Sequence, residues 1–187
     1  MRIIAGEFRG RRLHTPPSKS LRIRPTIDRV RESIFNIVAD KVPGAKVLDL
    51  FAGTGAMGME ALSRGARFCF FVDSGAEAVR IIRENVRLCA AQNRSHVIQG
   101  KVSSAIARLK SEGELFDLIF MDPPYGKGYV EETMQVLGPV ANDDTLVIAE
   151  QHIKDEPPLV PVSVWQKELD RRYGDTLVSV YSRLTIT

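Results

Sequence analysis

The chain has 187 residues, of which 44% are hydrophobic and 26% charged, and its formal net charge is +3. This length predicts one domain of ordinary size, with or without a small appendage. No apolar stretch approaches the roughly 18 residues that cross a bilayer, and the N-terminus lacks the apolar core of a signal peptide. We therefore expect a cytoplasmic protein that does not enter the membrane, and we expect it to be a monomer. Cys69 and Cys89 lack metal-ligand spacing, which predicts free thiols and no bound metal.

The positive charge is concentrated at the N-terminus. Residues 1–31 contain nine Lys or Arg and two acidic residues, whereas the remainder has 17 basic and 21 acidic ones. A basic arm on a mildly acidic body is typical of a polyanion-binding protein, because arginine attracts phosphates without reading sequence. The alternative is a solvated basic tail without a partner. The arginines expected to bind nucleic acid are Arg2, Arg9, Arg11, Arg12, Arg22 and Arg24.

The first 26 residues are predicted to form this arm, and residues 27–187 the main domain. Residues 2–5 and 11–14 flank the segment Gly6-Glu-Phe-Arg-Gly10, which indicates a small β-hairpin. A helix follows, since Ile27, Val30 and Ile34 recur at helical spacing. Thr26 is its expected N-cap, and the helix ends before Pro43.

Strands then alternate with helices along the chain. The expected strands are 46–51, 68–72, 96–99, 116–121, 145–149, 162–169 and 176–181, and the expected helices are 56–64, 76–90, 103–110 and 130–137. Such alternation predicts an α/β fold with a parallel sheet covered on both faces. The last two strands flank Tyr173-Gly-Asp175, which indicates an antiparallel C-terminal hairpin. We expect a seven-stranded, mostly parallel sheet.

A glycine-rich loop, Asp49 to Gly58, joins the first sheet strand to its helix. Its G-x-G-x-x-G spacing lets backbone approach a ligand at a helix N-terminus, and Asp73 follows Gly53 by 20 residues, where a carboxylate can accept ribose hydroxyls. A nicotinamide dinucleotide also fits the spacing. Asp49, however, suits a ligand with a cationic end better than a diphosphate, and S-adenosylmethionine is such a ligand. The remaining alternative is a glycine-rich turn that binds nothing.

Asp122-Pro-Pro-Tyr125 directly follows the buried strand 116–121. Neither proline has an N–H, so the Asp122 carboxylate and the Pro123 carbonyl are left as acceptors beside the Tyr125 ring. Such a site suits a planar group that carries an amine, although the same tetrapeptide also fits a simple strand stop. If the first and fourth strands are neighbours, this motif and the glycine loop line one crevice. Together they predict a methyl donor next to an amine acceptor.

Both motifs resemble those of the class I amino-methyltransferases, which have a Rossmann-like fold. Three further segments, Arg2 to Leu13, Arg24 to Glu32 and Tyr173-Gly-Asp-Thr176, resemble the RsmD family, and the similarity runs over essentially the whole chain. This resemblance implies transfer of a methyl group from S-adenosylmethionine to the exocyclic N2 amine of one guanine in bacterial 16S ribosomal RNA. It also implies that the partner is the small ribosomal subunit or an assembly intermediate, and that the basic arm binds RNA.

The resemblance assigns roles to particular residues. Asp122, Pro123 and Tyr125 are the expected catalytic residues. The expected donor-binding residues are Asp49, Phe51, Gly53, Thr54, Gly55, Asp73, Ser74, Val102 and Thr26. In one place the chain departs from the pattern, because Gly100-Lys101-Val102 stands where such enzymes place an acid that holds the adenine amine. We therefore expect backbone groups to hold the adenine there.

Other classes of protein remain as alternatives. A DNA amino-methyltransferase shares the Pro-Pro-Tyr motif but usually carries a target-recognition domain, for which 187 residues leave little room. A methyltransferase of protein glutamine leaves the basic arm without a purpose, and a cytosine-carbon methyltransferase needs a cysteine near the fourth strand. A non-catalytic RNA-binding assembly factor does not explain why Asp122-Pro-Pro-Tyr125 is intact.

Overall fold

The computed structural model describes residues 1–16, 25–155 and 157–184, with residues 25–27 described by their backbone alone. The predicted contributions of Arg22 and Arg24 therefore lie outside the described residues. The strands are β1 (Lys46–Leu50), β2 (Phe68–Asp73), β3 (Ser95–Gln99), β4 (Phe116–Met121), β5 (Ala141–His152), β6 (Trp165–Tyr173) and β7 (Thr176–Arg183). The helices are α1 (Pro25–Ile37), α2 (Ala56–Ser63), α3 (Ala76–Leu88), α4 (Val102–Ser111) and α5 (Tyr129–Leu137), with 3-10 turns at Ala39–Lys41, Gln92–Arg94 and Gly138–Val140. Among the described helices, none is long and apolar enough to span a membrane.

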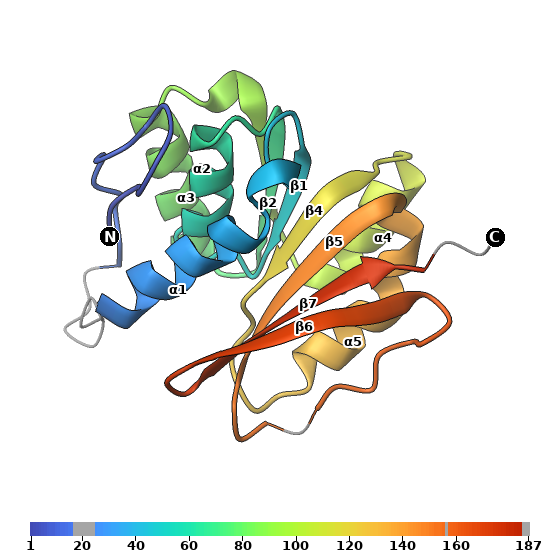
Figure 1. Ribbon diagram of the computed structural model, residues 1–187. Helices are drawn as coiled ribbons and strands as arrows, with labels where there is room; N and C mark the ends of the chain where they lie inside the picture. The colour runs from blue at the N-terminus through green and yellow to red at the C-terminus, as the bar shows by residue number, and fades with distance from the viewer. Residues whose placement is uncertain (17–24, 156, 185–187) are drawn as a thin grey trace.

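All seven strands form one sheet in the order β3-β2-β1-β4-β5-β7-β6 (Figure 1). The first five strands along the chain run parallel, and β7 is antiparallel to both β5 and β6. The prediction of a mostly parallel, seven-stranded sheet with an antiparallel hairpin is confirmed. The strand order reverses between β1 and β4, which is where open parallel sheets bind ligands.

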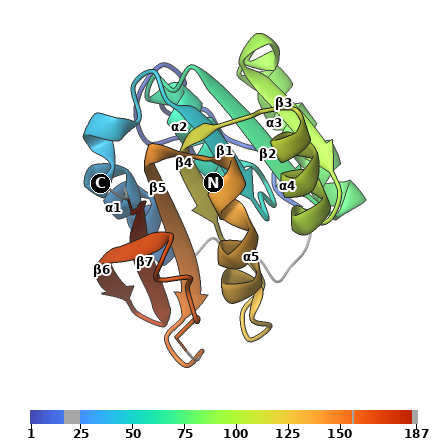
Figure 2. The same ribbon diagram turned by 90° about the vertical axis from the view of Figure 1, so that its right-hand side faces the viewer.

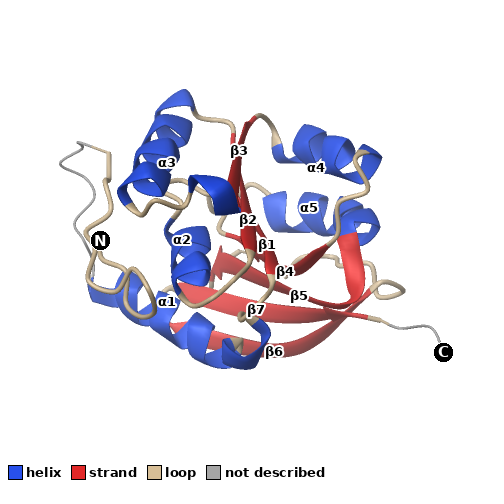
Figure 3. Ribbon diagram, turned by 90° about the horizontal axis from the view of Figure 1, so that it is seen from above, coloured by secondary structure: helices blue, strands red, loops and turns tan. Residues whose placement is uncertain are grey.

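Helices cover both faces of the sheet. Figures 2 and 3 show α1, α2 and α3 on one face and α4 and α5 on the other. Side chains of β1 alternate between the two cores, since Val47 packs toward α1–α3 whereas Leu48 and Leu50 pack toward α4 and α5. Both faces are thus buried, as a central parallel strand requires.

The N-terminal segment, residues 1–14, lies against α2 and α3. The expected hairpin is closed by a single antiparallel bridge between Arg2 and Arg12. Ile3, Phe8 and Leu13 belong to the core beneath α1–α3 and are at most 4% exposed. The arm therefore packs as part of the globular body over this stretch.

Two features of α2 hold that segment. Glu60, fully buried, accepts the backbone N–H groups of Ile4 and Ala5 at 2.8 and 3.0 Å. Gly6 approaches the end of α2 so closely that a Cβ there would lie 1.8 Å from the Ser63 carbonyl oxygen. Only glycine fits this contact, and its φ of +81° suits glycine as well.

Several predicted boundaries are corrected by the structure. Helix α1 begins at Pro25, so Thr26 lies inside its first turn and the predicted N-cap is wrong. Proline suits this first helical position because it lacks an N–H and the helix needs none there. Strand β1 ends one residue early, since Phe51 has a φ of +56°, which leaves the extended conformation. Strand β5 is longer than predicted, and β6 begins at Trp165 and continues to Tyr173.

Candidate active site

Four carboxyl groups lie near the carboxyl ends of four neighbouring strands. They are Asp49 in β1, Asp73 in β2, Asp122 directly after β4 and Glu150 in β5. Three of them lie two residues after a side chain of the α1–α3 core: Asp73 after Phe71, Asp122 after Phe120 and Glu150 after Ile148. The fourth, Asp49, is in register with Phe71 and Phe120. Because side chains alternate along a strand, all four carboxyls face the same side of the sheet.

The first two carboxyls hold the glycine loop. Asp73 accepts the N–H of Gly53 through Oδ2 and that of Gly75 through Oδ1, both at 2.8 Å. Asp49 accepts the N–H of Gly58 in the first turn of α2 at 2.9 Å. A Cβ on Gly58 would lie 2.3 Å from the Phe71 ring, so the loop needs glycine there for helix and strand to meet.

Asp49 lies behind the loop rather than in a cavity. Its side chain is 3% exposed, and burial raises its pKa to about 8 despite the bond from Gly58. The neighbouring charges of Asp122 and Asp73 act in the same direction as burial. Direct contact between Asp49 and a ligand stays a prediction, and the structure gives Asp49 a clear role in fixing α2.

A cavity of about 910 Å³ opens between the glycine loop and the Asp122 motif. Of the predicted site residues, it is lined by Phe51, Gly53, Asp73, Ser74, Val102, Asp122, Pro123 and Tyr125. Thr54 and Gly55, like Asp49, do not line it, and the side chain of Thr26 is outside the description. The adjacency of the two motifs, which the sequence predicted, is therefore present in the fold.

This cavity also contains residues that the sequence reasoning missed. Tyr129, Glu132 and Thr133 of α5 form part of its wall, and the Tyr129 ring lies 5.6 Å from that of Phe51. Gly126 and Gly128, both with positive φ, turn the chain into α5 directly after the tetrapeptide. The run Gly126-Lys-Gly-Tyr129 was the available signal, because paired glycines mark a tight turn at a helix start.

Asp122 combines access to the cavity with a raised pKa. Its side chain is exposed to the cavity, yet the surrounding walls remove enough water to raise its pKa to about 6. At neutral pH this carboxyl is mostly ionised. It is therefore available as a hydrogen-bond acceptor on the wall of the cavity.

Tyr125 is placed by the C-terminal hairpin. Its ring is 44% exposed and stands edge-on to His152 with the centroids 5.6 Å apart, while its hydroxyl lies 3.4 Å from that of Thr176. Asp155 accepts the N–H of Gly126 at 3.3 Å, which ties the loop to the turn after β5. The hairpin thus braces the aromatic ring and leaves one part of it accessible.

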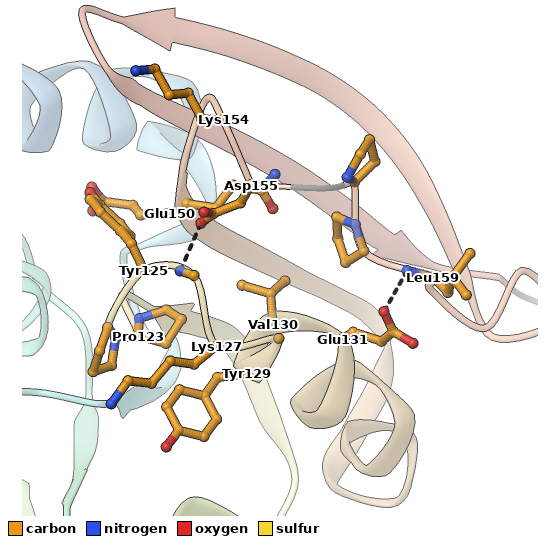
Figure 4. A pocket seen from close by; sticks show the side chains of 16 residues that line it. Pro123, Tyr125, Lys127, Tyr129, Val130, Glu131, Glu150, Lys154, Asp155 and Leu159 are labelled. Carbon is orange, nitrogen blue, oxygen red and sulfur yellow. Dashed lines mark hydrogen bonds between the residues drawn. The ribbon is translucent and has the colours of Figure 1, made fainter.

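A second cavity, of about 630 Å³, lies on the other side of the same tetrapeptide (Figure 4). Pro123, Pro124 and Tyr125 line both cavities, so this short segment is their common wall. The rest of the second cavity comes from the turn before α5, the first residues of α5, and residues 150–151, 154–155 and 157–159, with Glu150, Lys127 and Lys154 among its polar groups.

The described arginines of the N-terminal segment differ in their contacts. Arg11 donates to the Leu88 carbonyl at 2.6 Å and lies 5.3 Å over the Phe8 ring, and Arg2 donates to the Gly10 carbonyl at 3.4 Å. Arg9 and Arg12 are exposed, and their side chains make no hydrogen bond or ion pair with the part of the chain that is described. Their roles in RNA binding stay predictions.

Comparison with known proteins gives a consistent result. The family model described as "Conserved hypothetical protein 95" matches residues 1–182. Ribosomal RNA small subunit methyltransferase D of Escherichia coli strain K12 is 36% identical over 98% of this chain and 90% of its own length. The solved structure "Putative methyltransferase yhhF from Escherichia coli" has a TM-score of 0.84 and 32% identity, and covers 98% of this chain and 97% of its own.

A structure from another organism gives the same fold. The hypothetical protein TTHA0928 from Thermus thermophilus has a TM-score of 0.80 and 29% identity, with 96% of this chain and 98% of its own covered. The family model, the Escherichia coli relative and these two structures each match nearly the full length of the chain. The chain therefore belongs to the RsmD family of methyltransferases, and its fold is the Rossmann-like fold of that enzyme class.

Proposed function

We propose that this protein transfers a methyl group from S-adenosylmethionine to the N2 amine of a guanine in 16S ribosomal RNA of the small subunit. One observation carries the proposal: the segment Asp122-Pro-Pro-Tyr125 lies between two cavities. The first contains Asp73, a carboxylate that can accept ribose hydroxyls, and the second is large enough for a nucleobase. The substrate class comes from the relatives named as small-subunit ribosomal RNA methyltransferases.

The donor is assigned to the cavity of about 910 Å³. Asp73 accepts its ribose hydroxyls while keeping the two backbone N–H groups that it already holds. The adenine packs near Val102 and Tyr129, and backbone groups around Lys101 take its polar edge. No metal is assigned a role.

The acceptor base enters from the second cavity and stacks on Tyr125, a contact worth about 1–3 kcal/mol by analogy with other extruded bases. The Asp122 carboxylate and the Pro123 carbonyl each accept one N–H of the amine. The nitrogen then pyramidalises, and its lone pair points at the donor methyl group.

Transfer is a direct displacement. The N2 lone pair forms a bond to the methyl carbon as the carbon–sulfur bond breaks and its electrons pass to sulfur, which becomes the neutral thioether of S-adenosylhomocysteine. The methylated nitrogen then loses a proton to Asp122 or to water. Positioning of amine and methyl group is the main contribution of the protein.

Substrate RNA is held outside the cavities by the basic N-terminal segment. Arg9 and Arg12 are exposed there, and Arg11 lies beside them with its guanidinium anchored on α3. Phosphate contacts of this kind bind RNA without reading its sequence. A ribosomal substrate also places the protein in the cytoplasm.

The proposal is tested by following a labelled methyl group. Protein and labelled S-adenosylmethionine are incubated with unmodified small subunits, free 16S RNA and DNA, and the products are digested to nucleosides. We expect label in N2-methylguanosine from ribosomal RNA alone. Label in adenine, in DNA or in protein would contradict the proposal.

A further inference from the structure

Asp122 and Glu150 stand side by side at the ends of adjacent parallel strands. Phe120 pairs with Ile148 and Met121 with Ala149. The next residues are Asp122, directly after β4, and Glu150, in β5. Neighbouring strands are about 4.8 Å apart, and both side chains face the α1–α3 side of the sheet. The charge of Asp122 contributes to raising the pKa of Glu150, after the larger effect of burial, which is consistent with two close carboxyls.

Glu150 also lines the second cavity, together with Pro123 and Tyr125 (Figure 4). Other carboxylates of that cavity hold its walls: Asp155 accepts the N–H of Gly126, and Glu131 accepts that of Leu159 at 3.3 Å. The Glu150 carboxyl takes part in no hydrogen bond within the described residues, and Arg31 is the cation that favours its ionised form. Glu150 is therefore a carboxyl that holds no part of the wall by a hydrogen bond, and it lines the cavity that we assign to the base.

The nucleobases that carry an amine differ in the atom next to it. In guanine the neighbouring ring nitrogen, N1, carries a hydrogen, so N1–H and one N2–H are parallel donors. In adenine and cytosine the corresponding ring nitrogen has a lone pair instead. At neutral pH Asp122 is mostly ionised and Glu150 mostly holds a proton. With that proton directed at Asp122 when the base is bound, each carboxyl keeps one oxygen as an acceptor. Two such oxygens side by side match two parallel donors, whereas an acceptor oxygen facing a ring lone pair is repelled.

We propose that Glu150 accepts the N1–H of the target guanine while Asp122 accepts the adjacent N2–H, and that Glu150 thereby selects guanine over the other amino bases. This inference rests on the proposed function and adds the residue that fixes the base. It gives a reason from the fold itself for guanine, which otherwise follows from family resemblance alone.

The probe is 2-aminopurine, which keeps the 2-amino group of guanine but has a lone pair at N1. Once the methylated nucleotide is mapped, ribosomal RNA is prepared with guanine or 2-aminopurine at that position. The ratio of the two kcat/KM values is then measured for the wild type and for Glu150→Gln. We expect the preference for guanine to fall about tenfold or more in Glu150→Gln, because a good base contact contributes about that factor to discrimination and the amide can donate to the N1 lone pair.

Asp144→Asn is the matched control, since Asp144 is an exposed carboxylate at the opposite end of the same strand. It should keep the wild-type preference. Comparing ratios removes the difference in intrinsic reactivity between the two bases. If Glu150→Gln does not fold, Glu150→Asp keeps a carboxyl but withdraws it from the base, and the preference should again fall.

The outcomes separate the two proposals. An unchanged preference in a folded Glu150 variant that still methylates guanine would overturn the inference and leave Glu150 as a carboxyl that feels the charge of Arg31, while the proposed function would stand. Methylation of neither base by wild-type protein that binds the donor would overturn the proposed function, and the role of Glu150 with it.

Discussion

The sides of the crevice that we assign to the methyl donor and to the acceptor base use carboxyl groups in different ways. On the donor side, Asp49 and Asp73 accept backbone N–H groups of the glycine loop and of α2. On the acceptor side, the side chains of Asp122 and Glu150 accept no hydrogen bond from the described residues. A carboxyl at a strand end can therefore either build the site or remain available for substrate, and its backbone neighbours decide which.

The prolines explain part of this difference. Later in the chain, Gly58 donates its N–H to Asp49, and Gly75, two residues on, donates its N–H to Asp73. Pro123 and Pro124 follow Asp122 and have no N–H to offer. Asp122 is thus followed by two residues that cannot donate a backbone N–H to it.

The largest predicted effect is a loss of kcat without a loss of donor affinity. Asp122→Ala removes an acceptor that acts on the amine during transfer, so kcat should fall by about 10² to 10³ or more. Donor affinity, measured by calorimetry, should change little because Asp73 and the glycine loop are untouched. Equal loss of both would show that Asp122 belongs to the donor side.

The converse change is Asp73→Ala. It removes an acceptor for ribose and frees the N–H groups of Gly53 and Gly75, so donor affinity should fall about 10- to 100-fold. Affinity for RNA, measured separately by filter binding, should stay near the wild-type value. A weaker RNA complex with an unchanged donor complex would reverse the assignment of the two cavities.

Gly58→Ala tests the packing beneath the donor loop. The added Cβ would meet Phe71 at 2.3 Å and the Cys69 sulfur at 2.5 Å, so the free energy of unfolding should fall by about 1–3 kcal/mol. Gly100→Ala is the control, because a Cβ there meets nothing within 4 Å. Similar urea midpoints for the two variants would contradict the close approach of α2 to β2.

The carboxyl row also predicts how stability depends on pH. Asp49, Asp122 and Glu150 have pKa values of about 8, 6 and 8 in the folded protein, above their ordinary values of 3.8 and 4.5. Between about pH 4 and pH 8 the folded protein holds protons that the unfolded chain has lost, so the free energy of unfolding falls as pH rises.

Asp49→Asn should make this decline less steep, by at most about 1.4 kcal/mol per pH unit. Urea unfolding between about pH 5 and pH 8 measures it, with Asp144→Asn as the exposed control. An unchanged slope in Asp49→Asn would show that Asp49 does not bind a proton in the folded state.

The smallest predicted effect lies outside the crevice. Arg12→Ala should weaken RNA binding modestly and lower the salt dependence of log K by about one unit, without changing donor affinity. Arg108→Ala is the control, since Arg108 of α4 is paired with Glu112 directly after that helix. Equal effects of the two changes would argue against RNA contact at the N-terminal segment.

The sequence predicted the meeting of its two motifs at β1 and β4, because short motifs at strand ends are brought together by the topology of a parallel sheet. It did not predict that Glu60 would hold the N-terminal segment, since the partners of that buried carboxylate lie 55 and 56 residues away. Nor did it predict that Asp49 would lie behind the glycine loop or that Glu150 would stand beside Asp122. The roles of these carboxyls depend on which backbone N–H groups lie near each of them, and the spacing of residues in the sequence does not give that.

The measurement that most directly tests the division of the crevice is a crystal structure with S-adenosylhomocysteine. We expect its ribose hydroxyls within hydrogen-bond distance of Asp73, its adenine between Val102 and Tyr129, and its sulfur directed at Asp122 and Pro123. A ligand bound in the cavity beside Glu150, or with its sulfur turned away from Asp122, would contradict the proposed route of methyl transfer.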